Sequence, residues 1–192
     1  GTLELLELLA GLGSEVELDL LATAAGLDRL AVDARLRPAL EDGLLVLRPG
    51  DRRVRFRHDR VQQAAFNRLD RPARAALGLT VARRVAGSPS HGTVAAEQYL
   101  LAADALTDAG ERRRAAELMR DAARRAQLLA NDPLVERFAV AGLELAGDQP
   151  TAGLVLDLLT LRHAALVGQA RFEAADDVYA RIAAAGAAPE AL

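Results

Sequence analysis

The sequence predicts a mainly α-helical chain with one small β-hairpin in its first half. Of the 192 residues, 51% are hydrophobic but only 3% are aromatic, so Leu, Ala and Val must build the core. Such a core is typical of helices packed on helices. Apolar residues recur at helical spacing along most of the chain. Only residues 44–47 and 53–57 have the apolar run and the period-two alternation that indicate strands.

The first part of the chain is expected to hold three helices, the hairpin and two more helices. Gly26 is typical of the residue that follows a helix, and Asp28 of the residue that caps the next one. Pro38 should kink that third helix or delay its start. Three helices followed by a hairpin is the order of a winged helix-turn-helix. The expected helices span 3–12, 17–25, 28–42, 58–69 and 72–86, and a turn at 49–51 joins the strands.

A Gly-, Ser- and Pro-containing stretch at residues 87–92 predicts the boundary between a domain at 1–87 and one at 92–192. The second domain is expected to be helical throughout. Near its end, Phe172, Ala175, Tyr179 and Ile182 have the spacing of the second helix of a tetratricopeptide repeat. This predicts a short tetratricopeptide-like α-solenoid, with an ordinary antiparallel helical bundle as the alternative. The expected helices span 93–108, 111–130, 133–146, 151–168 and 171–185, and a degenerate repeat copy lies 41 residues earlier at Leu134, Phe138 and Ala141.

Several classes of function find no support in the sequence. No stretch of about 18 apolar residues could span a membrane, and no signal peptide is visible. Cysteine is absent, which fits a cytoplasmic protein. Neither His91 nor His163 has metal ligands at suitable spacing, and no serine lies in a nucleophile motif. We therefore expect a non-enzymatic fragment of a longer protein that contains no metal and no cofactor of its own.

Positive charge is concentrated around the hairpin. Residues 48–84 hold eleven Arg and three Asp, a net charge of +8, whereas residues 1–47 have a net charge of −6. Such a segment can contact a DNA backbone, dock another protein domain, or form a solvated surface. The third helix argues against DNA, because it has several acids and no Lys, Asn or Gln to contact base edges. The candidate interaction residues are Arg53, Arg55, Arg57, Arg60, Gln62 and Gln63.

His58 and Asp59 stand where the second strand turns into a helix. On a purely structural interpretation, His58 ends the strand and Asp59 caps the helix. The surrounding segment RFRHDRVQQAAF also resembles the winged-helix domain of the signal-transduction ATPases with numerous domains, the STAND group. More narrowly, HDRVQQAAF is similar to the HDRVQQAAY segment of large bacterial signalling proteins, in which an AAA-type ATPase region lies between a Ser/Thr kinase or regulator and C-terminal sensor or output domains. The segments LELLELLAGLGSEVELDLLATAAGLD and LRPALEDGLLVL are also similar to that family.

The resemblance implies a role for this junction. In the STAND group, the His of a Met-His-Asp motif contacts the β-phosphate of bound ADP and holds the inactive state. His58 and Asp59 match its second and third positions, and Arg57 replaces the Met. The resemblance thus implies that His58 is a nucleotide sensor supported by Asp59. Gln62 and Gln63 belong to the same motif, so a contact with another domain is worth testing; the alternative is that they face solvent or form a hydrogen bond between helices. ATP or ADP would be held by an upstream ATPase domain, since a chain without Lys contains no phosphate-binding loop of the Walker type.

The sequence therefore predicts a non-catalytic regulatory module of a multidomain signalling ATPase. The winged helix would dock on the upstream nucleotide-binding domain, and the helical repeats would bind a protein partner or transmit the switch. The alternative is a DNA-binding transcriptional regulator whose helical part serves as an effector or dimerisation domain.

Overall fold

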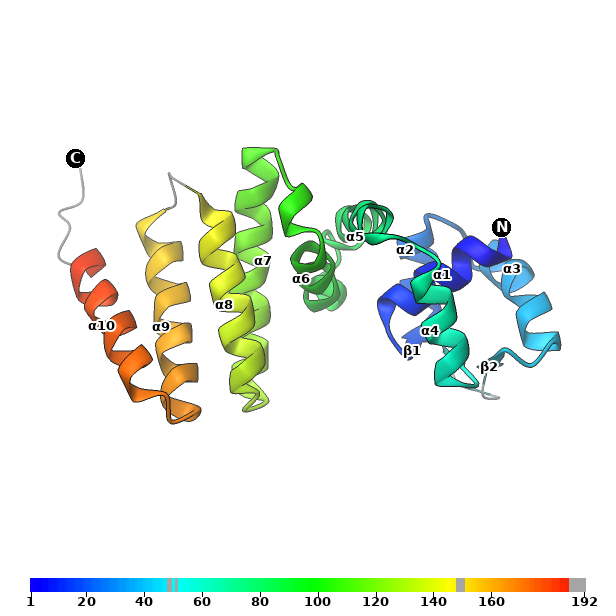
Figure 1. Ribbon diagram of the computed structural model, residues 1–192. Coiled ribbons are helices and arrows are strands. Elements are labelled where there is room, and N and C mark those ends of the chain that lie inside the picture. The colour runs from blue at the N-terminus through cyan, green and yellow to red at the C-terminus, as the bar shows by residue number, and fades with distance from the viewer. Residues whose placement is uncertain (48–49, 51, 148–150, 187–192) are drawn as a thin grey trace. The chain divides into compact units, whose positions relative to one another are not determined.

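A computed structural model describes residues 1–47, 50, 52–147 and 151–186. The chain divides into two compact units, unit 1 (residues 1–102) and unit 2 (residues 103–192). Figure 1 shows the elements of each unit. The boundary expected at residues 87–92 falls within unit 1, because the helices on either side of it pack on one another. Of the hairpin turn expected at 49–51, only Gly50 is among the described residues.

Unit 1 contains six α-helices, a 3₁₀ turn at Pro89–His91 and three strands among its described residues. Its first five helices begin and end within two residues of the predicted bounds. The Asp28 carboxylate accepts a hydrogen bond from the backbone N–H of Ala31, and Gly26 adopts a φ of 66° after the preceding helix. Pro38 lies within the third helix, which begins at Arg29, so the proline does not delay its start. The elements are α1 (Thr2–Leu12), β1 (Glu15–Glu17), α2 (Leu18–Ala25), α3 (Arg29–Glu41), β2 (Leu45–Leu47), β3 (Arg53–Phe56), α4 (Asp59–Asn67), α5 (Arg71–Val85) and α6 (Gly92–Leu101).

The predicted hairpin is present, because β2 and β3 pair antiparallel, but it belongs to a sheet of three strands in the order β1-β3-β2. The unpredicted strand β1 has only three residues and runs directly into α2. Val16 of β1 pairs with Val54 of β3, and both side chains are buried against the helices. The third strand stabilises the sheet, because a lone two-stranded hairpin is only marginally stable in water.

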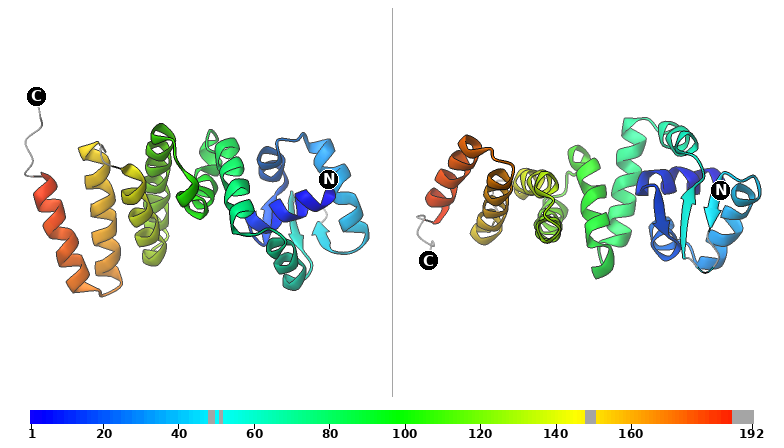
Figure 2. Two further views of the ribbon diagram at one scale, coloured as in Figure 1. Left: turned by 45° about the horizontal axis from the view of Figure 1, so that its top comes forward. Right: turned by 90° about the horizontal axis from the view of Figure 1, so that it is seen from below.

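Unit 2 consists mainly of four helices: α7 (Ala109–Leu128), α8 (Asp132–Ala146), α9 (Ala152–Gly168) and α10 (Phe172–Gly186). They follow one another in chain order in Figure 1 and in the left view of Figure 2, and each packs on the next. The helix expected at 93–108 is shorter than predicted: α6 ends at Leu101, and a single 3₁₀ turn follows at Ala103–Ala105. In the described part of the chain, every helix is too short or too polar to cross a lipid bilayer.

The two helix pairs of unit 2 repeat each other with an offset of 40 residues. The turn after α7 places Ala130 at φ 52°, and the turn after α9 places Ala170 at φ 57°. The next residue closes both turns in the same way: Asn131 donates to the carbonyl of Ala126 at 3.0 Å, and Arg171 to that of Leu166 at 2.9 Å. The offset of 41 residues expected from the sequence is therefore one residue too long.

This register changes which residues of α10 form its packing face. Ala175 and Val178 are each 2% exposed and pack against α9, whereas Phe172 and Tyr179 are 62% and 61% exposed. The repeat pattern placed these two aromatic rings at helix contacts, but both are exposed to solvent.

Candidate functional site

His58 and Asp59 lie at the start of α4, directly after the central strand of the sheet. Strand β3 ends at Phe56, and His58 is the N-cap residue of α4 with extended backbone angles of −134° and 135°. Its carbonyl accepts hydrogen bonds from the N–H groups of Val61 and Gln62, at 3.0 and 3.3 Å. The structural interpretation that Asp59 caps this helix was wrong. Asp59 is instead the first helical residue, where the positive end of the helix dipole stabilises its negative charge.

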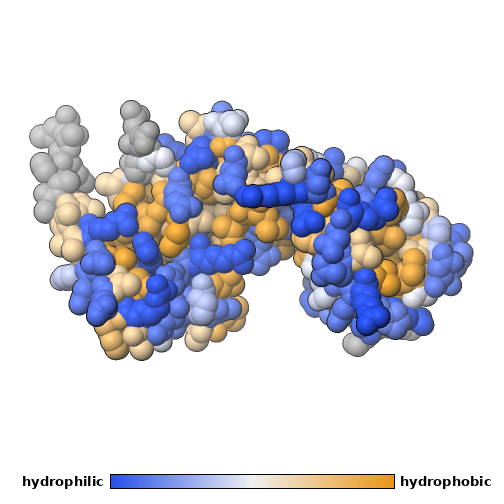
Figure 3. All heavy atoms as spheres, viewed as in Figure 1, coloured by the Kyte–Doolittle hydropathy of each residue, from blue (hydrophilic) through white to orange (hydrophobic). Residues whose placement is uncertain are grey.

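The N-terminus of α4 is open to solvent. His58, Asp59 and Arg60 are all exposed, and their side chains have no hydrogen bond or ion pair within the described residues. The surface where α4 begins is deep blue, that is hydrophilic, in Figure 3. Backbone N–H groups at a helix start are unpaired within the helix and carry partial positive charge. This end could therefore receive an anionic group, with the imidazole of His58 as an additional donor.

Arg53 and Arg55 lie on the outer face of the central strand, beside two glutamates. Arg53 is opposite Glu17 in the register of β1 and β3, and its guanidinium contacts that carboxylate at 3.0 Å. Arg55 is opposite Glu15, and its buried Nε has no hydrogen-bond partner among the described residues. The acidic strand β1 thus offsets part of the positive charge that the sequence concentrates on β3.

We expect the Arg53–Glu17 pair to couple by only about 0.2–1 kcal/mol, because both side chains are about half exposed (51% and 52%). A double-mutant cycle of Arg53→Gln and Glu17→Gln, measured by chemical denaturation, checks this. The coupling should shrink in high salt. Arg60→Gln is the matched control, because Arg60 has no ion pair in the described structure and should show no coupling to Glu17.

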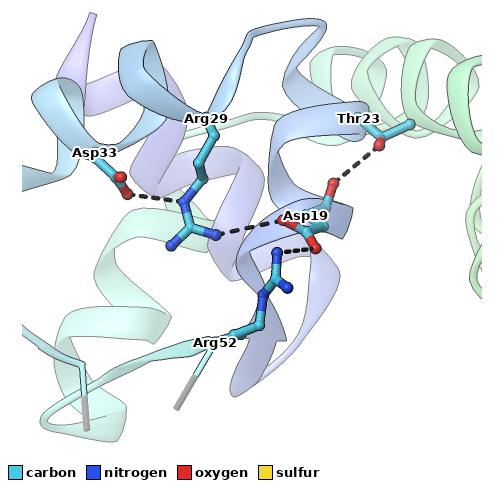
Figure 4. A network of polar contacts seen from close by, with 5 residues as sticks. All are labelled: Asp19, Thr23, Arg29, Asp33 and Arg52. Atoms are coloured by element: carbon cyan, nitrogen blue, oxygen red, sulfur yellow. Dashed lines mark hydrogen bonds and ion pairs between the residues drawn. The ribbon is translucent and has the colours of Figure 1, made fainter. Parts of the chain in front are cut away.

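A second set of ion pairs fixes the beginning of β3 to helices α2 and α3, as Figure 4 shows. Asp19 of α2 contacts Arg52 at 2.7 Å and Arg29 at 3.4 Å, and Arg29 also contacts Asp33 at 3.0 Å. These particular partners could not be predicted from the sequence. Its only signal was the separation of acids before residue 48 from arginines after it, which is consistent with attraction between the two segments.

The remaining candidate residues lie on α4 and just before it. Gln62 is half-buried, whereas Gln63 is exposed and donates to the side-chain oxygen of Asn67 at 3.0 Å. The exposed Arg57 side chain lies over Gly43, at the turn that follows α3. The structure thus places His58, Asp59, Arg60 and the two glutamines on one short helix, while Arg53 and Arg55 lie on the adjacent strand.

An apolar cavity of about 170 Å³ lies in unit 1 among α1, α4, α5 and α6. The guanidinium of Arg74 stacks on the ring of Phe66 at 4.4 Å, and Gln98 donates to the carbonyl of Gly11 at 3.2 Å. Sequence reasoning did not find this cavity, because it depends on how four separate helices pack. Within the described residues, no group of three or more His, Asp or Glu side chains is placed to hold a metal ion.

Comparisons with known proteins add no identification: no family model, no curated protein and no solved structure matches the chain. The resemblance of residues 55–66 to the STAND winged helix thus stays a prediction.

Proposed function

We propose that this chain is a non-catalytic regulatory module of a multidomain signalling ATPase. In this proposal, unit 1 is a winged helix that docks on an upstream nucleotide-binding domain of the same protein. Unit 2 is a tetratricopeptide-like α-solenoid that binds a protein partner or transmits the switch. Support for the winged helix comes from the order α1-β1-α2-α3-β2-β3, and support for the solenoid from the 40-residue repeat of the helix turns.

The observation that carries the proposal is the open start of α4. His58 is held at the N-cap by backbone hydrogen bonds, while its imidazole remains exposed beside unpaired helix N–H groups. An imidazole N–H can donate to a phosphate oxygen, and a helix N-terminus favours the anion. A nucleotide phosphate held by another domain could contact both the imidazole of His58 and the unpaired N–H groups at the start of α4.

The DNA-binding alternative has weaker support. Arg52 and Arg53, the arginines best placed at the start of β3 to contact a phosphate backbone, are engaged with Asp19 and Glu17. Helix α3, which would enter the major groove, exposes a leucine: Leu30 is 81% exposed. A steep salt dependence of DNA binding in the low-micromolar range would reverse this order of preference.

The test is the affinity for ADP of the protein extended by the proposed ATPase domain. His58→Ala should weaken ADP binding at least tenfold in isothermal titration calorimetry, equivalent to about 1.4 kcal/mol. His91→Ala is the matched control, because His91 lies between α5 and α6, away from the start of α4, and should leave the affinity unchanged. Equal affinities of wild type and His58→Ala would show that His58 only terminates a strand and begins a helix.

A further inference from the structure

The apolar cavity of unit 1, among α1, α4, α5 and α6, is large enough for one small ring. Leu69, Leu77 and Leu101 line it together with the ring of Phe66. Its volume of about 170 Å³ is large for a space between packed helices, because close-packed interiors leave few voids larger than a water molecule. Apolar cavities of about 150 Å³ can hold a benzene ring. The space is therefore sufficient for a single ring-shaped molecule.

One wall of the cavity contains a hydrogen-bond acceptor that the protein does not use. Gln98 of α6 is 6% exposed, and its Nε2 donates to the carbonyl of Gly11 at 3.2 Å. Because a carbonyl only accepts, this bond fixes the orientation of the amide and leaves Oε1 as its free end. Oε1 lies 3.6 Å from where a Cβ on Gly78 would stand, and it receives no hydrogen bond from the described residues. All three residues line the cavity, so a ligand there could donate to this buried oxygen.

A guanidinium also lines the cavity, on the same side of α5 as Gly78. Arg74 precedes Gly78 by one helical turn, about 6 Å along the axis. The Arg74 guanidinium stacks on the ring of Phe66 at 4.4 Å, and its Nε donates to the carbonyl of Leu69 at 2.8 Å. These contacts hold the planar group in place, while Nη1 and Nη2 have no hydrogen bond or ion pair within the described part of the chain. A guanidinium fixed in this way is suited to bind a carboxylate.

The acidic side chain at the cavity does not reverse this preference. Glu7 lines the cavity from α1, but its carboxylate accepts a hydrogen bond from Nε of Arg68 at 3.0 Å. The charges of Glu7 and Arg68 therefore offset each other. The charge of Arg74 is not offset by an ion pair among the described residues, so the cavity favours an anion over a neutral molecule or a cation.

We propose that this cavity binds a small aromatic carboxylate with a hydroxyl group opposite the carboxylate. The ring fills the space between the leucines, the hydroxyl donates to Oε1 of Gln98, and the carboxylate accepts from the guanidinium of Arg74. A benzene ring with substituents in para positions has about the length of the helical turn that separates Arg74 from Gly78. A simple aliphatic acid offers no donor to Gln98, and a neutral phenol no charge to Arg74. His58 does not line the cavity, so the inference goes beyond the proposed function and does not depend on it.

The test compares three probes by isothermal titration calorimetry with the full chain. The wild type should bind para-hydroxyphenylacetate at one site per chain. Phenylacetate, which lacks the hydroxyl, should bind about fivefold more weakly because Oε1 of Gln98 then stays unpaired. The neutral para-cresol should bind about tenfold more weakly, because it loses a charge-assisted hydrogen bond. Amide NMR spectra should show shifts at Gly11, Gly78 and Gln98, which places the probe in this cavity and not elsewhere on the chain.

Two variants separate the roles of the polar residues. Gln98→Met keeps the approximate size of the side chain but removes the oxygen, so it should bind para-hydroxyphenylacetate and phenylacetate equally. Arg74→Gln should weaken the binding of both acids about tenfold and leave the affinity for para-cresol unchanged. Arg37→Gln is the matched control, because it removes the same charge from an exposed position on α3 outside the cavity. Circular dichroism checks that each variant is folded.

Three results would overturn the proposal. The first is a wild type that binds none of the probes at millimolar concentration, which would leave the cavity to water or to a side chain of another domain. The second is equal affinity for all three probes, because burial of the ring alone would then explain binding. The third is an equal loss in Arg74→Gln and Arg37→Gln, which would reflect the overall charge of the chain. The comparison of probes on the wild type decides the matter even if Gln98→Met does not fold.

Discussion

Replacement of Leu36 by alanine is expected to lower the free energy of unfolding of unit 1 by about 2–5 kcal/mol. Leu36 lies on α3 and is 1% exposed, where that helix packs on α1, α2 and β2. The truncation removes buried apolar atoms and leaves a cavity that the surrounding helices fill only in part. Because alanine is also a good helix former, the loss measures packing and not helix propensity.

Leu30→Ala is the matched control on the same helix, since Leu30 is 81% exposed. It should change the free energy of unfolding by less than about 0.5 kcal/mol. Hydrogen exchange of peptides from unit 1 is the suitable measurement, because a chain with two compact units need not unfold in one step. Equal losses of protection in the two variants would show that α3 does not pack as described.

Most of the helices could be predicted closely from the sequence, because the signals that begin and end them are local. Asp28 and Asp70 each cap a helix with their own carboxylate, and Gly26 ends another in the left-handed conformation. Such signals act within a few residues, so they can be recognised in the sequence without knowledge of the fold. Strand β1 lacked a local signal: three residues, Glu15-Val16-Glu17, become a strand only because β3 lies alongside.

The candidate site likewise has features that could be predicted from local sequence and features that depend on the fold. The position of His58 at a strand-to-helix junction was predictable, because the alternation at Val54 and Phe56 stops just before it. The contact between Arg53 and Glu17 was not, because it requires the register of two strands that are 36 residues apart. The exposure of Phe172 and Tyr179 was missed for a related reason. An aromatic spacing shows which residues share a side of a helix, but not which neighbour covers that side.

The second large effect is expected at Gly142, where three helices of unit 2 meet. A Cβ on this residue would lie 2.8 Å from Cδ2 of Leu158 on α9 and 3.2 Å from Cβ of Met119 on α7. Leu158 and Met119 are both 0% exposed, so neither side chain has free space to enter. Gly142→Val should therefore destabilise unit 2 by about 1–3 kcal/mol through overpacking, although a glycine inside a helix is itself unfavourable.

Gly153 provides the control, because it lies in the first turn of α9 and has no heavy atom within 4 Å of the position that a Cβ would occupy. Gly153→Val should leave the free energy of unfolding within about 0.5 kcal/mol of the wild type. Hydrogen exchange of peptides from α7, α8 and α9 should distinguish the two variants. Only Gly142→Val should accelerate exchange in all three helices, since its side chain would force α9 away from both of its neighbours. If both variants behaved alike, α9 would not pack closely on Gly142.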